Sequence, residues 1–266
     1  IRTDKSAIVA KNANTNIILK NAQVEAGNGV LVQMMDTDDP GLAGDFIDVS
    51  MYAKLEDEYI PGRDLTSADP MMDLFVTVQD SDLVGDIFNS STNLPRLASK
   101  EKPAGIPKRP GIVPPGRLAG SIPSGDGPAA PPPPPNVDSM KDGDGPMMMP
   151  NMGPPGPKNL QVVLDASTLT GAISAAKQRY REGITYIDET TREELCNVTQ
   201  FPAPAINNGV IVELKHGARW TLTETSFLTS LTIGEGCCVE GVLTVDGKET
   251  AAVPGTYTGV IQVKKA

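Results

Sequence analysis

The sequence predicts an all-β fold in which short strands repeat along the chain, as in a solenoid. The first observation is a spacing in the C-terminal quarter. Trp220-Thr221-Leu222, Leu231-Thr232-Ile233 and Leu243-Thr244-Val245 begin 11 and 12 residues apart, with polar or Gly-containing corners between them. Apolar residues that alternate with Thr over a few positions are typical of strands. The second observation is that aromatic residues make up only 4% of the 266 residues, which favours a narrow aliphatic core.

The third observation is an internal repeat. Residues 74–87 align without gaps on residues 160–173, and Leu, Val, Ser, Leu, Gly and Ile recur at matching places. The offset is 86 residues, and it falls to 22, about two strand units, if residues 94–157 are an insertion. Self-similarity of this kind marks repeat architectures, so we expect the two segments to be neighbouring turns that stack like side chains.

The chain divides into five regions in order. Strand-like runs with Asn-rich or Gly-rich corners, which tolerate left-handed backbone, predict the first turns at residues 1–35. An acidic loop is expected next, and a short excursion, in which 175–182 and 190–195 have the pattern of short helices, is expected to interrupt the last region. The expected regions are 1–35, first coil or coils; 36–72, acidic loop; 73–93, coil; 94–158, Pro-rich arm; and 159–266, final coils with the excursion at 174–207.

Asp36-Thr37-Asp38-Asp39 is a segment whose acidic residues suggest a Ca²⁺ site. It resembles the start of a Ca²⁺ loop but lacks the later Gly and the terminal Glu of an EF-hand. We therefore expect a solvated acidic loop, with Ca²⁺ as a weak alternative and no other cofactor.

The arm is a low-complexity segment with a basic start. Residues 103–157 hold 17 of the 24 prolines, and residues 96–117 hold six Lys or Arg against one Glu in a chain of net charge −10. We expect it to cross a contact between subunits, with a clasp on its own acidic body and a solvated linker as alternatives. A Met run could bind copper(I), although adaptable apolar contact is the simpler interpretation. The expected assembly residues are Arg96, Lys102, Lys108, Arg109, Arg117, Met147, Met148, Met149 and Met152.

Charge and cysteine content argue against several other classes of protein. The net charge of −10 argues against a nucleic-acid partner, and no apolar run of 18 residues predicts a membrane span. The chain starts at Ile1 in strand-like sequence, which suggests a processed product or a fragment of a longer chain. Adjacent Cys237 and Cys238 with a distant Cys196 are a poor zinc signature. One cysteine is expected to pack as a small hydrophobe, and a bridge from Cys196 to the pair is the alternative.

Three segments carry a resemblance to a known group of proteins. Residues 217–233 (Gly-Ala-Arg-Trp-Thr-Leu-Thr-Glu-Thr-Ser-Phe-Leu onward), residues 245–259 and the rung-like residues 16–25 resemble secreted bacterial right-handed parallel β-helix proteins of the adhesin-like and autotransporter-like kind. The resemblance covers about half of the chain. It implies a right-handed parallel β-helix, secretion and a place outside the cell or at its surface.

The function expected from these observations is an extracellular structural or adhesive protein, not an enzyme. Such a protein would assemble as a homo-oligomer, filament or surface layer through the strand edges at its ends and through the arm. One alternative is a lyase-like enzyme on polysaccharides, with Asp80, Asp82 and Asp165 stacked near Arg179 or Arg181; the sole His216 is expected at an exposed corner. The other is a module that binds a surface glycan or a receptor.

Overall fold

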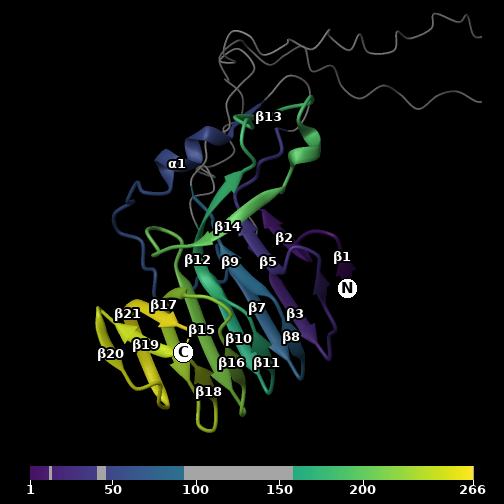
Figure 1. The fold of residues 1–266 in the computed structure, drawn as a ribbon. Coiled ribbons are helices and arrows are strands. Elements are labelled where there is room, and N and C mark those ends of the chain that lie inside the picture. The colour runs from purple at the N-terminus through teal and green to yellow at the C-terminus, as the bar shows by residue number, and fades with distance from the viewer. Residues whose placement is uncertain (12–13, 41–45, 93–157, 266) are drawn as a thin grey trace, which may run out of the picture. The chain divides into compact units, whose positions relative to one another are not determined.

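The computed structural model describes residues 1–11, 14–40, 46–92 and 158–265, all in one compact unit. Within them the chain is mostly β, with several sheets that mix parallel and antiparallel pairs and one short α-helix, so the all-β prediction holds in this coarse form (Figure 1). The nine expected assembly residues of the arm lie outside the described residues. The chain leaves the described part after Thr92 and re-enters it at Lys158, whose amide donates to Ser91 Oγ at 3.1 Å.

The largest sheet has eight strands in the order β20-β19-β21-β17-β15-β10-β7-β3. From β3 to β17 every pair is parallel, whereas β21, β19 and β20 join by antiparallel pairs. The strands are β3 (Asn16–Lys20), β7 (Leu74–Gln79), β10 (Leu160–Asp165), β15 (Val210–Lys215), β17 (Ser226–Ile233), β19 (Val242–Val245), β20 (Lys248–Thr250) and β21 (Gly255–Lys264).

Two smaller sheets contain strands that come after those of the large sheet along the chain, such as β8 and β9 after β7. The four-stranded sheet, in the order β18-β16-β11-β8, is wholly parallel, and the five-stranded sheet, β14-β12-β9-β5-β2, is parallel except for the pair of β12 with β14. The four-stranded sheet holds β8 (Asp82–Val84), β11 (Thr168–Thr170), β16 (Arg219–Thr221) and β18 (Cys238–Glu240). The five-stranded sheet holds β2 (Ile8–Lys11), β5 (Val30–Met35), β9 (Asp86–Asn89), β12 (Ile173–Tyr180) and β14 (Val198–Pro202).

The remaining elements are short. β1 (Arg2–Thr3) pairs with β4 (Glu25–Ala26), and β6 (Ile47–Asp48) pairs with β13 (Tyr186–Ile187). The helical elements are η1 (Val49–Met51), α1 (Tyr52–Leu55) and η3 (Arg192–Glu194).

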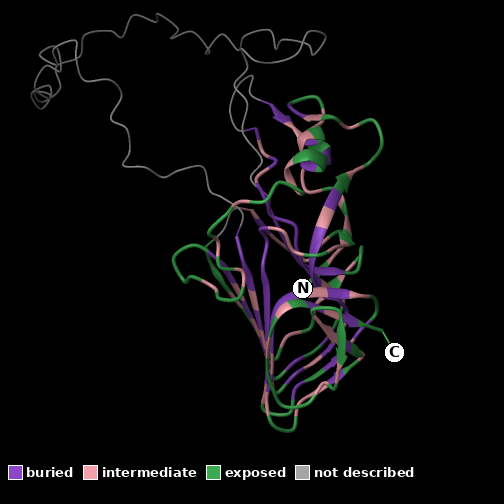
Figure 2. Ribbon diagram, turned by 90° about the vertical axis from the view of Figure 1, so that its left-hand side faces the viewer, coloured by how far each residue is buried: buried purple, intermediate pink, exposed green. Residues whose placement is uncertain are grey.

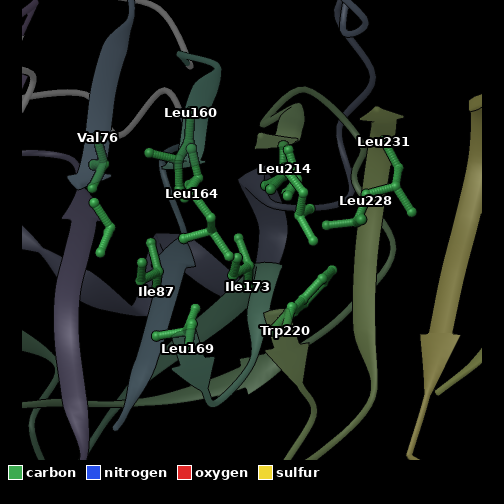
Figure 3. Close-up of a cluster of buried hydrophobic side chains, with 14 of the residues drawn as sticks. Val76, Ile87, Leu160, Leu164, Leu169, Ile173, Leu214, Trp220, Leu228 and Leu231 are labelled. Atoms are coloured by element: carbon green, nitrogen blue, oxygen red, sulfur yellow. The ribbon is translucent and has the colours of Figure 1, made fainter. Parts of the chain in front are cut away.

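The strand registers confirm the internal alignment. β10 pairs with β7 so that Leu160 faces Leu74 and every later pair keeps the 86-residue offset; β11 on β8 and β12 on β9 keep it too. Like residues therefore stack on one another and fill one continuous aliphatic core, and the core side chains converge between the sheets (Figure 3). Trp220 is fully buried there and donates from Nε1 to the carbonyl of Gly171 at 2.8 Å. Most buried residues lie in the strands, and many of the turns are exposed (Figure 2).

The corners after β3, β7, β10 and β15 share one backbone conformation. Asn21, Asp80, Ala166 and His216 each directly follow one of these strands and have φ between 47° and 52°, in the left-handed region. Asn and Asp tolerate this conformation better than other non-glycine residues, so the repeated turn accounts for the Asn at the first corner and the Asp at the second.

The structure differs from the prediction in the first half of the excursion expected at residues 174–207. Residues 175–182 do not form a helix: most of this segment lies in β12, which pairs with β9 and then with β14. Ala175, Ala176 and Gln178 are buried there, and the pairing outweighs the helix propensity of the sequence. In the second half the predicted helix is reduced to the single turn η3 after Thr191.

The acidic region is also not a plain solvated loop. It contains β6, η1 and α1, and Asp36 and Asp38 are buried, at 3% and 0% exposure.

Candidate functional site

The open edge of the eight-stranded sheet is the first candidate site. β3 ends the strand order, and among the described residues no strand pairs with its other side (Figure 1). Phe75 N donates to Thr15 O at 2.9 Å and Asn21 N to Gln79 O at 3.1 Å, so the odd-numbered residues of this segment bond to β7. Because these groups alternate along a strand, Asn16, Ile18 and Lys20 direct their N–H and C=O groups toward the open edge.

The side chains of the same three residues are exposed on the outer face of the sheet. Ile18, in the middle of the strand, is 65% exposed. Ile17 and Leu19 point to the inner face, where Leu19 belongs to the core and Ile17 packs against it only partly buried. An exposed apolar residue at the centre of an unpaired strand is typical of an edge that another strand can cover.

Three of the other sheet edges are better protected, whereas β2 (Ile8–Lys11) and β8 (Asp82–Val84) end their sheets with apolar residues, as β3 does. β20 is three residues long and carries Lys248 and Glu249. β18 is equally short and carries Glu240. β14 ends at Pro202, which cannot donate a backbone hydrogen bond. Short, charged or proline-containing edges resist pairing with another chain. The edges at β3, β2 and β8 therefore differ from those at β14, β18 and β20, and β3 is the longest of the three apolar ones.

A buried carboxylate near the end of the five-stranded sheet is the second feature. Lys11 Nζ lies 2.5 Å from Asp38 Oδ1, while the Tyr180 hydroxyl and the Cys196 amide donate to Oδ2 at 2.5 and 2.7 Å. Tyr52 stacks on Tyr180, with ring centroids 6.2 Å apart. Three distant segments thus meet on the Asp38 carboxylate. Since both oxygens are occupied by protein groups, the cluster fastens the segments together and is not set up to bind Ca²⁺.

This environment shifts the pKa values around Asp38. Burial would lower the pKa of Lys11, but the hydrogen bond and charge of Asp38 outweigh it and the pKa is raised. Burial, with the charge of Asp38 added, raises the pKa of Tyr180 far above its usual range and also raises that of the Cys196 thiol. The raised pKa values keep the Lys11 amine charged and the Tyr180 phenol and Cys196 thiol neutral at neutral pH.

The residues that would form a lyase site are not brought together. Asp80 and Asp165 lie in adjacent turns, where Asp80 N donates to Asp165 O at 3.1 Å. Arg179 belongs to the other end of β12 and holds Glu56 with two hydrogen bonds, and Arg181 pairs with Glu194 at 2.6 Å. Both arginines are committed to fastening the segments that cover this end of the sheet.

His216 is exposed at its corner, as the sequence predicts, but it has a partner that sequence reasoning missed. Its Nδ1 lies 2.5 Å from Asp165 Oδ1. Asp165 pairs with Lys215 in the register of β10 and β15. His216 directly follows Lys215, and this places its side chain beside Asp165. The spacing of 51 residues gives no local signal, so only the strand pairing reveals the contact.

The described residues contain no group of three or more His, Cys, Asp or Glu side chains placed to hold a metal ion. In the same part of the chain the three cysteines form no disulfide. Cys237 packs against the core, as expected of a small hydrophobe.

A pocket of about 310 Å³ opens beside the irregular pairing of β17 with β21. Its wall is largely apolar, with Phe227 and Val260, and it has a carboxylate at Asp246, which accepts from Val260 N at 2.9 Å. An apolar wall with an aromatic ring and a few acceptors is the usual composition of a small-ligand site.

Comparison with known proteins finds no matching family model, no similar curated protein and no similar solved structure. Among the described residues, no helix has the length and apolar character needed to cross a membrane.

Proposed function

We propose that this chain is an extracellular structural or adhesive protein, whose three sheets are the faces of a right-handed parallel β-helix. The order in which the chain visits the sheets supports the proposal. β7, β8 and β9 belong to the eight-, four- and five-stranded sheets in turn, and β10, β11 and β12 repeat that order one strand further along each sheet. The next strands, β15 and β16, begin a third round. The handedness and the extracellular setting rest on the resemblance in sequence.

The observation that carries the functional part is the unprotected edge at β3. A stack of parallel strands has two ends, and each end must be covered or used in a contact. Antiparallel β21, β19 and β20 continue the eight-stranded sheet at one end, whereas β3, β8 and β2 end the three larger sheets at the other end of the described structure. We propose that this protein assembles through the β3 end, with the arm as a second contact.

The test is electron microscopy and sedimentation of the chain with and without residues 94–157. The deletion can be closed by a short linker, because Ser91 and Lys158 are hydrogen-bonded. We expect extended assemblies from the full chain and only small oligomers from the deleted chain. Monomers in both preparations, at the highest concentrations reached, would contradict the proposal.

A second candidate function, a glycan-binding module, is favoured by the pocket at Phe227. A sugar ring could stack on Phe227 while a hydroxyl donates to the Asp246 carboxylate. Titration with a panel of monosaccharides, followed by NMR, tests it. Shifts confined to pocket residues that vanish in Phe227→Ala would support it, and the absence of shifts at millimolar sugar would exclude it for that panel.

A further inference from the structure

We propose that Lys11 and Asp38 join in an intramolecular isopeptide bond, a covalent amide between the lysine Nζ and the aspartate Cγ. This modification goes beyond the proposed function, and it can be tested without any measurement of assembly. It would turn the buried cluster around Asp38 from an ion pair into a covalent link between two segments of the chain.

The two reacting groups lie close together at a site that excludes water. Lys11 Nζ is 2.5 Å from Asp38 Oδ1, and the Asp38 side chain has no exposed surface. The contact is oblique, because Oδ1 is buried without an aligned hydrogen-bond donor among the described residues. Since Cγ is one bond of about 1.2 Å from Oδ1, the amine lies close to the distance of about 3–3.5 Å at which reacting atoms are poised for attack.

An exposed lysine–aspartate pair of the same chain provides a comparison. Lys177 Nζ lies 2.8 Å from Asp57 Oδ1, but both side chains meet water, at 31% and 61% exposure. Water solvates an exposed ammonium and carboxylate and keeps both groups charged. The Lys177 pair therefore lacks the conditions for the reaction and serves as its control.

The two carboxylate oxygens of Asp38 have different surroundings, and each suits a different part in the reaction. Oδ2 accepts hydrogen bonds from the Tyr180 hydroxyl at 2.5 Å and from the Cys196 amide at 2.7 Å, whereas Oδ1 faces Lys11. When the amine adds to Cγ, negative charge develops on an oxygen, and two donors already aimed at Oδ2 would stabilise it there. Oδ1 is then the oxygen that leaves. The product amide keeps Oδ2 and both of its hydrogen bonds.

The reaction balances without any added reagent. A proton first passes from the Lys11 ammonium to Asp38 Oδ1, which gives a neutral amine and a carboxylic acid. This transfer cancels two charges at a buried site, where charge is costly. The lone pair of the amine then forms the N–C bond to Cγ. A second proton moves from the nitrogen to the Oδ1 hydroxyl, the Cγ–Oδ1 bond breaks, and one water molecule is released.

The two donors to Oδ2 are held in place by their own surroundings. The Tyr180 ring stacks on Tyr52, with ring centroids 6.2 Å apart. Cys196 has a φ of 59°, in the left-handed region that non-glycine residues rarely adopt, and in this conformation its N–H donates to Asp38. Backbone strain that a fold maintains at one point is typical of sites where a group must be positioned.

The bond would close a ring in the chain. Lys11 ends β2 and pairs with Met35, the last residue of β5, and Asp38 follows three residues later. The ring would hold β3, β4 and β5, so it would tie together strands of two of the larger sheets. A link of this kind restricts the unfolded chain as a disulfide does, but a reductant does not break it.

The experiment is mass spectrometry of the folded full chain, denatured and reduced just before the measurement. We expect a mass that is lower than the mass of the sequence by one water molecule. Proteolysis should then release one branched peptide that contains both Lys11 and Asp38, and trypsin should not cleave after Lys11. The control residues, Lys177 and Asp57, should appear in separate, unmodified peptides.

Matched variants locate the bond. Lys11→Arg keeps a cation but offers no amine nucleophile and should restore the full mass, whereas Lys177→Arg should keep the loss of one water. Cys196→Ser retains the backbone donor and should also keep the loss, which excludes a link through the thiol. Tyr180→Phe removes one of the two donors to Oδ2, so we expect a smaller linked fraction in freshly purified protein.

Two results would overturn the proposal. One is the full mass in a parent chain that circular dichroism shows to be folded. The other is a loss of water that persists in Lys11→Arg, because the water would then come from another site. The branched peptide is sought in the parent chain itself, so this measurement does not depend on whether a variant folds, and its detection would support the bond directly.

Discussion

Replacing Gly171 by Ala should be among the most damaging single changes in the described part of the chain. A Cβ atom at this position would lie 2.0 Å from the carbonyl oxygen of Gly85 and 2.6 Å from its carbon, in the neighbouring turn. These are backbone atoms, held in place because Gly171 N donates to Thr221 O at 2.9 Å and Gly85 N donates to Thr170 O at 2.8 Å. The two turns must therefore separate, and they cannot do so by rotating a side chain.

The expected loss has two parts. Forcing extra volume into a packed site costs about 1–3 kcal/mol. Gly171 O also accepts the hydrogen bond of the fully buried Trp220 indole, and weakening that bond costs about 1–3 kcal/mol more. We expect a decrease in the free energy of unfolding of about 3–5 kcal/mol. For a domain of this size that is a fall of roughly 10 °C in the melting temperature.

Chemical and thermal denaturation, followed by circular dichroism, measure this change. Gly183→Ala is the matched control: its φ of 88° is unfavourable for Ala, but nothing lies within 4 Å of the added Cβ. The control should lose only about 1 kcal/mol from backbone strain. If Gly171→Ala loses no more than Gly183→Ala, the close stacking of the turns at this corner is wrong.

Four further substitutions test other parts of the structure. Ala166→Gly should raise the free energy of unfolding by about 0.5 kcal/mol, since glycine adopts the φ of 47° without strain; an unchanged or lower value by denaturant unfolding would refute the turn geometry. Asp38→Asn should cost about 3 kcal/mol by leaving the Lys11 ammonium half-buried without its counter-charge, and Tyr180→Phe about 1 kcal/mol, both by the same measurement; parental stability of Asp38→Asn would refute the cluster. Hydrogen bonds from Ser67 and Thr66 lower the pKa of Asp64, so its contribution is present above the usual aspartate range and is lost as the pH falls through the lowered value. Asp64→Asn should flatten that acid limb in a pH series, and an identical limb would contradict the assignment.

The core could be predicted from the sequence because the same residue types recur at matching positions. Leu74 and Leu160, or Ile87 and Ile173, stack in the structure at the offset found in the chain itself. A repeated turn has one environment at each position, so the side chain that fits there is similar in every copy.

Segments outside the repeat could not be predicted in this way. The run from Ala175 to Glu182 has good helix formers, but its conformation is decided by pairing with β9 and β14, and no property of the run itself signals those partners. Asp38 is buried for the same reason. Its partners Lys11, Tyr180 and Cys196 come from distant segments, and without them an aspartate in an acidic stretch is expected in water.

The charge of the arm decides how it can take part in assembly. The eight-stranded sheet ends at β20, a short and charged strand that is a poor surface for an edge contact. Extended assemblies of this protein would therefore need a contact of another kind, and residues 96–117, with six Lys or Arg against one Glu in a chain of net charge −10, offer one by sequence. Attraction between exposed charges weakens as salt is added. We therefore expect the extended assemblies of the full chain to shrink as the ionic strength rises, and assemblies of unchanged size in high salt would contradict this role of the arm.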